Sequence, residues 1–106
     1  MDIDFNNIVV ENNAAARRYQ AKVGEHLAVV EYRLDADTIT FTHTLVPKEL
    51  EGHGIANKLG HAALEDARAR QLTVVPLCPF IASYIRRHQE YLALVDPAHR
   101  ERVTKG

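Results

Sequence analysis

The stretch Val46-Pro-Lys-Glu-Leu-Glu-Gly-His-Gly-Ile-Ala56 decides the fold, because the spacing of apolar residues changes there. Before it, residues 38–46 alternate threonines with mostly apolar side chains, a pattern typical of a half-buried β-strand. After Pro47, apolar residues recur every three or four positions to about Arg70, as on one face of a helix. The stretch therefore predicts a strand, a glycine-containing loop and a long helix in direct succession.

The two glycines of this loop are suited to phosphate binding. Glycine lets backbone N–H groups approach a ligand closely, and the start of a helix adds partial positive charge. The loop lacks the Gly-Lys-Ser/Thr ending of a P-loop, and no third glycine follows where a Rossmann fingerprint requires one. Two alternatives remain: a pyrophosphate-binding loop outside those classes, or a helix-entry turn that binds nothing.

The residues before this stretch predict an antiparallel sheet. Polar and apolar side chains alternate in three runs, at residues 16–23, 26–34 and 38–46. Gly24-Glu25 and Asp35-Ala-Asp37 separate these runs as turns, which predicts a meander. Closer to the N-terminus, Glu11-Asn-Asn13 is typical of another turn.

The residues after the long helix predict one more strand and further helix. The run Leu72 to Leu77 is typical of a buried strand, in which Pro76 interrupts ladder pairing. Pro79, a favoured first helical residue, begins a second helix, and a short helical tail starts at Pro97. This order of elements predicts an α+β layer with a mixed sheet, in one domain spanning residues 1–106.

The composition excludes several classes of protein. A net charge of −1 gives no general attraction to nucleic acid or to an anionic membrane. The apolar runs are far too short for a membrane span, and no secretory signal is visible. The lone cysteine suits a reducing cytoplasm, and the six histidines lack the spacing of a zinc site. We expect a cytoplasmic monomer or weak dimer without metal, nucleic acid or membrane partner.

Four segments of the chain, taken in order, carry a resemblance to a known family. They are Val46-Pro47, Gly52-x-Gly-Ile-Ala56, Pro76-Leu-Cys-Pro-Phe80 and Tyr84-Ile-x-Arg-His88. They resemble the small single-domain members of the GCN5-related N-acetyltransferase (GNAT) family, over residues 16–95. The family's loop, Gln/Arg-x-x-Gly-x-Gly/Ala, is met by Glu49-Leu-Glu-Gly-His-Gly54. Glu49 departs from this pattern, because Gln or Arg is common at its position, and His53 stands where a Lys or Arg is common. The loop of this chain is therefore less cationic than is usual in the family.

The resemblance implies a minimal GNAT fold: a mixed, mostly antiparallel sheet with splayed central strands, packed by one long helix and one or two short ones. It implies acetyl-CoA as the co-substrate. The pantetheine arm would pair with the backbone at Leu45 and Val46. Of the basic residues that end the second helix, one, for which we choose Arg87, would meet a CoA phosphate or a carboxylate on the acceptor. The alternative for Arg87 is that it only complements the dipole of a helix C-terminus. The pyrophosphate would lie on the amides of Glu51, Gly52, His53, Gly54, Ile55 and Ala56.

Two side chains are candidates for catalysis. Cys78 precedes the second helix, where unpaired N–H groups and the helix dipole favour a thiolate. It would take an acyl group or protonate the leaving CoA thiolate. The alternative is a small buried apolar residue. His43, expected on the apolar face of its strand with Ile39, Phe41 and Leu45, would deprotonate the incoming amine. The alternative is a core histidine hydrogen-bonded to the backbone.

The resemblance thus implies acetyl transfer from acetyl-CoA to an amine of unknown identity. The connection at residues 11–15 is too short for the extra helices that shape the acceptor site in larger members, so we expect an open acceptor side. Such a site would suit an exposed amine on a macromolecule or a poorly selective reaction. Two alternatives stay open: a non-catalytic CoA or acyl-CoA-binding module that acts as sensor or partner, and a small interaction domain without a ligand.

Overall fold

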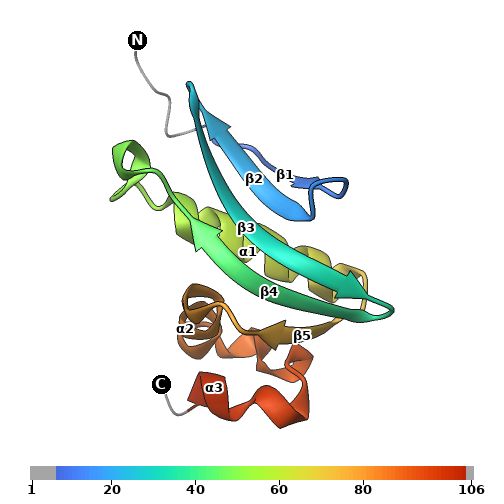
Figure 1. Cartoon of the computed structure of the whole chain (residues 1–106). Helices are drawn as coiled ribbons and strands as arrows, with labels where there is room; N and C mark the ends of the chain where they lie inside the picture. Colours follow the sequence, from blue (N-terminus) through green and yellow to red (C-terminus); the bar gives the residue numbers. More distant parts are fainter. Residues whose placement is uncertain (1–6, 105–106) are drawn as a thin grey trace.

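The structure, a computed structural model, describes residues 7–104 and has a five-stranded sheet in the order β1-β2-β3-β4-β5 (Figure 1). The strands are β1 (Val10–Asn13), β2 (Arg18–Val23), β3 (His26–Asp35), β4 (Thr38–Leu45) and β5 (Thr73–Pro76). Neighbouring strands from β1 to β4 are antiparallel, and β5 runs parallel to β4. The mixed, mostly antiparallel sheet is therefore confirmed.

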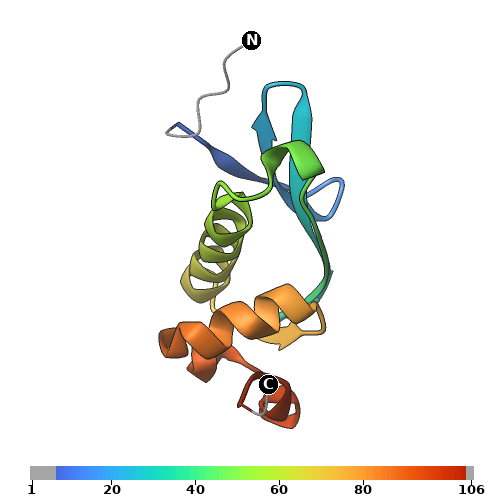
Figure 2. The same cartoon turned by 90° about the vertical axis from the view of Figure 1, so that its left-hand side faces the viewer.

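Two of the helices pack on one side of this sheet, and the third lies beyond its β5 edge (Figure 2). They are α1 (Ile55–Ala69), α2 (Pro79–Arg87) and α3 (Glu101–Thr104), with 3-10 turns η1 (Lys48–Leu50), η2 (Gln89–Leu94) and η3 (Pro97–His99). α1 and α2 touch at Gly60, where an added Cβ would lie 3.3 Å from the ring of Phe80. No helix within residues 7–104 is long and apolar enough to cross a membrane.

The N-terminal edge of the sheet differs from the prediction. Glu11-Asn-Asn13 does not form a turn but belongs to β1, and the turn follows at residues 14–17. Polar side chains hold this strand to β2: Gln20 Nε2 donates to Glu11 Oε1 (2.7 Å), and Asn13 Nδ2 donates to Gln20 Oε1 (3.2 Å). An edge strand faces solvent, so it carries polar residues that resemble a turn in sequence.

A β-bulge in β4 changes which side chains face the helices. Tyr32 pairs with Phe41 but its neighbour Glu31 pairs with His43, so Thr42 is the extra residue. Such an extra residue shifts the alternation of side chains by one position. Thr44 therefore turns inward toward the helices, opposite to expectation.

His43 and Leu45 consequently lie on the outer face of the sheet. They do not share the buried face of Ile39 and Phe41, as the alternation predicted. The side chain of His43 is 70% exposed, and Leu45 is 57% exposed. The expected apolar surroundings of His43, and its alternative as a buried core histidine, are both wrong.

The two central strands splay, as the resemblance implied. The β4–β5 ladder ends at the pair Phe41 and Pro76, whereas β4 continues to Leu45. Proline has no N–H with which to extend the ladder. The last link is the N–H of Cys78, which donates to the carbonyl oxygen of Phe41 (2.9 Å). Beyond that point β4 has an open edge toward α2.

Candidate functional site

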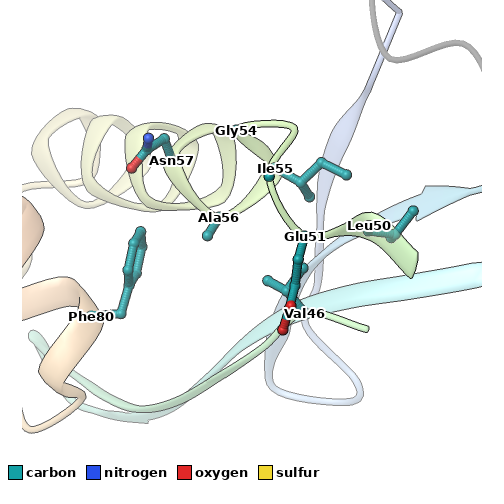
Figure 3. A pocket seen from close by; sticks show the side chains of 9 residues that line it. Val46, Leu50, Glu51, Gly54, Ile55, Ala56, Asn57 and Phe80 are labelled. Atoms are coloured by element: carbon teal, nitrogen blue, oxygen red, sulfur yellow. The ribbon is translucent and has the colours of Figure 1, made fainter. Parts of the chain in front are cut away.

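A pocket of about 250 Å³ lies between the end of β4, the glycine loop, the start of α1 and the first turn of α2 (Figure 3). Its lining residues are Val46, Leu50, Glu51, Gly52, Gly54, Ile55, Ala56, Asn57 and Phe80. Six of them were expected to bind a cofactor. His53 is exposed and does not line the pocket.

Three residues that line the pocket were not predicted from the sequence. Leu50 is a buried anchor of η1, and Asn57 lies in the first turn of α1. Phe80 reaches the pocket from α2, because Gly60 allows that helix to approach α1. The spacing of apolar residues assigns Phe80 to a helix face but does not show which other element it meets.

Left-handed backbone at both glycines shapes the loop. Gly52 has φ +83° and Gly54 has φ +75°, a region that side-chain-bearing residues avoid. An added Cβ at either position would meet nothing within 4 Å, so conformation and not crowding favours glycine. Gly54 is the N-cap of α1, and no side chain caps the first N–H groups of the helix. These donors belong to residues that line the pocket.

Glu51 contributes differently from the expectation. Its N–H already donates to the carbonyl oxygen of Lys48 (3.2 Å), so this amide is not open to an anion. Its carboxylate is the one charged side chain among the pocket-lining residues. Glu49, the other acidic residue of this segment, lies 3.9 Å from His26 Nδ1 and does not line the pocket.

Cys78 is the N-cap of α2, which confirms the predicted helix start at Pro79. Cys78 is only 2% exposed, and its Sγ lies 3.1 Å from Oγ1 of Thr44. The bulge creates this contact, because it turns Thr44 inward. The thiol and the hydroxyl thus meet on the inner side of the opening between β4 and α2.

The backbone at the opening belongs to Thr44. The N–H of Tyr32 donates to the carbonyl oxygen of Arg17, just before β2 (3.0 Å). Backbone direction alternates along a strand, so Val29 faces β4. Its partner Leu45 turns its N–H and C=O toward β3, and Thr44 turns its own toward the opening. Thr44, and not Leu45, therefore offers backbone groups to a ligand there.

His43 is not brought together with Cys78. Its imidazole lies on the outer face, where Nδ1 is 3.7 Å from Oε1 of Glu31. The two candidate catalytic side chains therefore flank the end of β4 from opposite faces of the sheet. No group of three or more His, Cys, Asp or Glu residues within residues 7–104 is arranged to hold a metal ion.

Arg87 is also distant from the pocket residues. It lies in the last turn of α2, whereas Phe80 lies in the first turn, seven residues earlier, which is a rise of about 10.5 Å along the helix. The guanidinium of Arg87 is 5.8 Å from the ring centroid of Tyr84. Its neighbours have structural contacts: Arg86 Nε donates to Val103 O (2.7 Å), and His88 stacks on Tyr84.

Comparison with protein families adds an independent observation. A family model described as GCN5-related N-acetyl-transferase matches residues 18–95. The matched range begins with β2 and contains every residue that lines the pocket, together with Thr44 and Cys78.

Proposed function

Because the chain belongs to the GCN5-related N-acetyltransferase family, we propose that it transfers the acetyl group of acetyl-CoA to an amine. The observation that carries this proposal is the pocket at the glycine loop, which adjoins the open edge of β4. A phosphate site and an extended open edge together suit a ligand with a pyrophosphate and a long amide-containing arm.

The loop would hold the pyrophosphate through backbone amides. The N–H groups of Gly52, Gly54, Ile55 and Ala56 are the donors that would contact it, and the N-terminal end of α1 adds favourable dipole charge. Among residues 7–104, no lysine or arginine lines the pocket. Binding therefore depends on the left-handed conformation of Gly52 and Gly54.

The open edge of β4 would hold the pantetheine arm. The N–H and C=O of Thr44 can pair with its amides in the manner of an added strand. The thioester would then lie near the Thr44–Cys78 contact. A backbone N–H at this edge would polarise the thioester carbonyl, which develops negative charge as the amine attacks.

Cys78 would act on the sulfur of the leaving CoA. It either donates its proton to the CoA thiolate or carries the acetyl group transiently, and Thr44 Oγ1 holds the thiol in place. Mass spectrometry separates the two roles, since only the second yields an acetylated Cys78 when acetyl-CoA is present without an amine.

Calorimetric titration with acetyl-CoA tests the pocket. We expect Gly54→Ala to weaken binding at least about tenfold, because a side chain in left-handed backbone costs about 1–2 kcal/mol and displaces the amides. The matched control is Gly24→Ala, which has the same strain at φ 61° in the β2–β3 turn and should bind normally. Wild-type protein that takes up no acetyl-CoA at millimolar concentration would contradict the proposal.

A non-catalytic acyl-CoA-binding module is the second candidate. The carboxylate of Glu51 in the pocket and the deep burial of Cys78 favour it. Turnover against a panel of amines separates the two functions. For an enzyme, Cys78→Ala should lower kcat about a hundredfold and leave the Kd of acetyl-CoA unchanged. Binding without turnover of any amine would favour the module.

A further inference from the structure

Another pocket, of about 360 Å³, lies at the end of the sheet opposite to the glycine loop. Its lining comes from β1, from β3, from the turns that follow these two strands, and from the C-terminal end of α1, which meet at the right in Figure 1. Two arginines, Arg17 and Arg70, line it, and we call it the arginine pocket. We propose that the arginine pocket binds a small phosphate monoester through these two guanidinium groups. This site is independent of the proposed acetyl transfer.

Backbone strain is concentrated around the arginine pocket. Within residues 7–104, left-handed backbone occurs at three residues other than glycine: Arg17 (φ 57°), Ala36 (φ 52°) and Gln71 (φ 57°). The first two line the pocket, and Gln71 follows directly after Arg70. Such backbone is unfavourable for a residue with a side chain, and it clusters at functional sites. A glycine at position 17 would relieve the strain but would remove the guanidinium.

The charged side chains that line the arginine pocket are both cationic. No residue in the part of the chain that the structure describes forms a hydrogen bond or an ion pair with the side chain of Arg17. Arg70 donates from Nη1 to Oδ2 of Asp66 (3.1 Å), but a guanidinium has five N–H donors, so others remain. Asp35 and Asp37 lie at the β3–β4 turn and do not line the pocket. The arginine pocket therefore favours an anion.

The neutral lining residues indicate what kind of anion fits. The hydroxyl of Tyr32 donates to Oδ1 of Asn12 (2.6 Å), which leaves Nδ2 of Asn12 to donate to a ligand. Two guanidinium groups and an amide match the three oxygens and the charge near −2 of a phosphate group better than the two oxygens and single charge of a carboxylate. Apolar side chains of Ala14, Leu34 and Ala36 line the rest of the pocket. They would contact the organic part of a phosphate monoester.

The arginine pocket is far from the pocket at the glycine loop. The two pockets lie at opposite ends of α1, which begins at Ile55 and has Arg70 as its C-cap. The rise along the helix between these two residues is about 22 Å. The two pockets share no lining residue, so both can be occupied at the same time.

An NMR titration with phenyl phosphate tests the site and shows where the ligand binds. We expect the Nε signals of Arg17 and Arg70 and the amide signal of Ala36 to shift together. Phenyl phosphate should bind about tenfold more tightly than inorganic phosphate, because the ring covers apolar surface. Shifts confined to the amides of Gly52 and Gly54 would overturn the proposal, because the phosphate would then occupy only the glycine loop.

Calorimetry on charge variants tests the role of the guanidinium group. Arg17→Gln should weaken phenyl phosphate binding about tenfold, because it removes a charged hydrogen-bond donor. The matched control is Arg33→Gln, which makes the same change of net charge at an exposed position of β3 outside the pocket and should bind normally. Equal weakening by both variants, or normal binding by Arg17→Gln, would overturn the proposal. Loss of acetyl-CoA binding by wild-type protein would contradict only the proposed acetyl transfer.

Urea denaturation tests whether the strain is kept for binding. Arg17→Gly should unfold at a higher urea concentration than wild type and lose phenyl phosphate binding, because glycine accepts left-handed backbone. The control Ala36→Gly should gain stability in the same way and keep the ligand, since both arginines remain. An Arg17→Gly variant that still binds phenyl phosphate as tightly as wild type would overturn the proposal.

Discussion

A single residue, Thr42, determines which side chains the end of β4 presents to each face. Without the bulge, His43 would face the helices and Thr44 would face solvent. With it, Thr44 contacts Cys78, and His43 lies beside Glu31. The chemical character of the opening between β4 and α2 thus depends on one unpaired position in a ladder.

Another residue-scale feature is the carboxylate of Glu51 in a pocket suited to phosphate. We predict that Glu51→Gln strengthens CoA binding by up to about fivefold, because interactions between exposed charges are worth about 0.2–1 kcal/mol. The gain should shrink with added salt, which screens the repulsion. Calorimetry at low and high salt measures both effects.

The control for Glu51 is Glu49→Gln. Glu49 lies in the same segment but pairs with His26 and does not line the pocket, so its substitution should alter CoA affinity much less. Equal gains from both variants would show that only the net charge of the segment matters. Weaker binding by Glu51→Gln would mean that the carboxylate holds the ligand.

At the scale of elements, periodicity predicts most of the fold. β2 to β5, α1 and α2 all occur where the alternation or the three-to-four spacing indicates them. The glycine loop could also be predicted, since left-handed backbone at a helix start favours glycine whatever surrounds it. β1 could not, because its polar residues suit an edge strand and a turn equally well.

The errors at the site have a common physical cause. The threonine alternation continues through residues 38–44 as if the strand were regular, so nothing local marks Thr42 as the extra residue. The bulge depends on the pairing of β3 with β4, which is a tertiary property. Phe80 was missed for the same reason, because its place in the pocket depends on the contact between α1 and α2.

The contact between η2 and α1 depends on a buried tyrosine. Tyr91 is 1% exposed and donates to Oε2 of Glu65 (2.5 Å), which Arg68 also contacts. The hydrogen bond from Arg68, and then that from Tyr91, lower the pKa of Glu65 below its usual 4.5. Burial, and then the bond to Glu65, raise the pKa of Tyr91 above its usual 10.0.

We predict that Tyr91→Phe lowers the free energy of unfolding at pH 7 by about 1 kcal/mol, the usual net value of one hydrogen bond. The lowered pKa of Glu65 means that its contribution is present above pH 4.5 and is lost as the pH falls through the folded-state pKa. The raised pKa of Tyr91 means that its contribution is lost as the pH rises above 10. The difference in the free energy of unfolding between wild type and Tyr91→Phe should therefore become smaller at both acidic and alkaline pH.

Urea denaturation at pH 3, 7 and 10.5 measures these differences. The control is Tyr32→Phe, because Tyr32 is also buried but donates to the neutral amide oxygen of Asn12 (2.6 Å). Tyr32→Phe should lower the free energy of unfolding by a similar amount at pH 7, and this loss should not become smaller at pH 3. A loss that stays constant from pH 7 to pH 3 in Tyr91→Phe would show that Glu65 is not its energetic partner.

At the scale of the whole molecule, the C-terminal segment completes the same core that supports the site. Val95 bridges the outer edge of β5 at Val74, and the N–H of Asp96 donates to Val74 O (2.9 Å). Val103 of α3 is fully buried in one apolar cluster with residues of β2, β3 and β4. Arg86 joins α2 to the carbonyl oxygen of Val103. Helix α2, which has Cys78 as its N-cap and Phe80 in its first turn, is therefore held in place by the C-terminal segment.

We accordingly predict that Val103→Ala lowers the stability of the entire domain. Two buried methyl groups are worth about 1–2 kcal/mol, and the matched control Val9→Ala, at a position 75% exposed, should change stability by less than about 0.5 kcal/mol. Circular dichroism and the fluorescence of the four tyrosines should report one shared transition, since a single core unfolds cooperatively. Separate transitions in the variant, with acetyl-CoA binding kept after the first, would instead show that α3 unfolds alone and that the site does not depend on it.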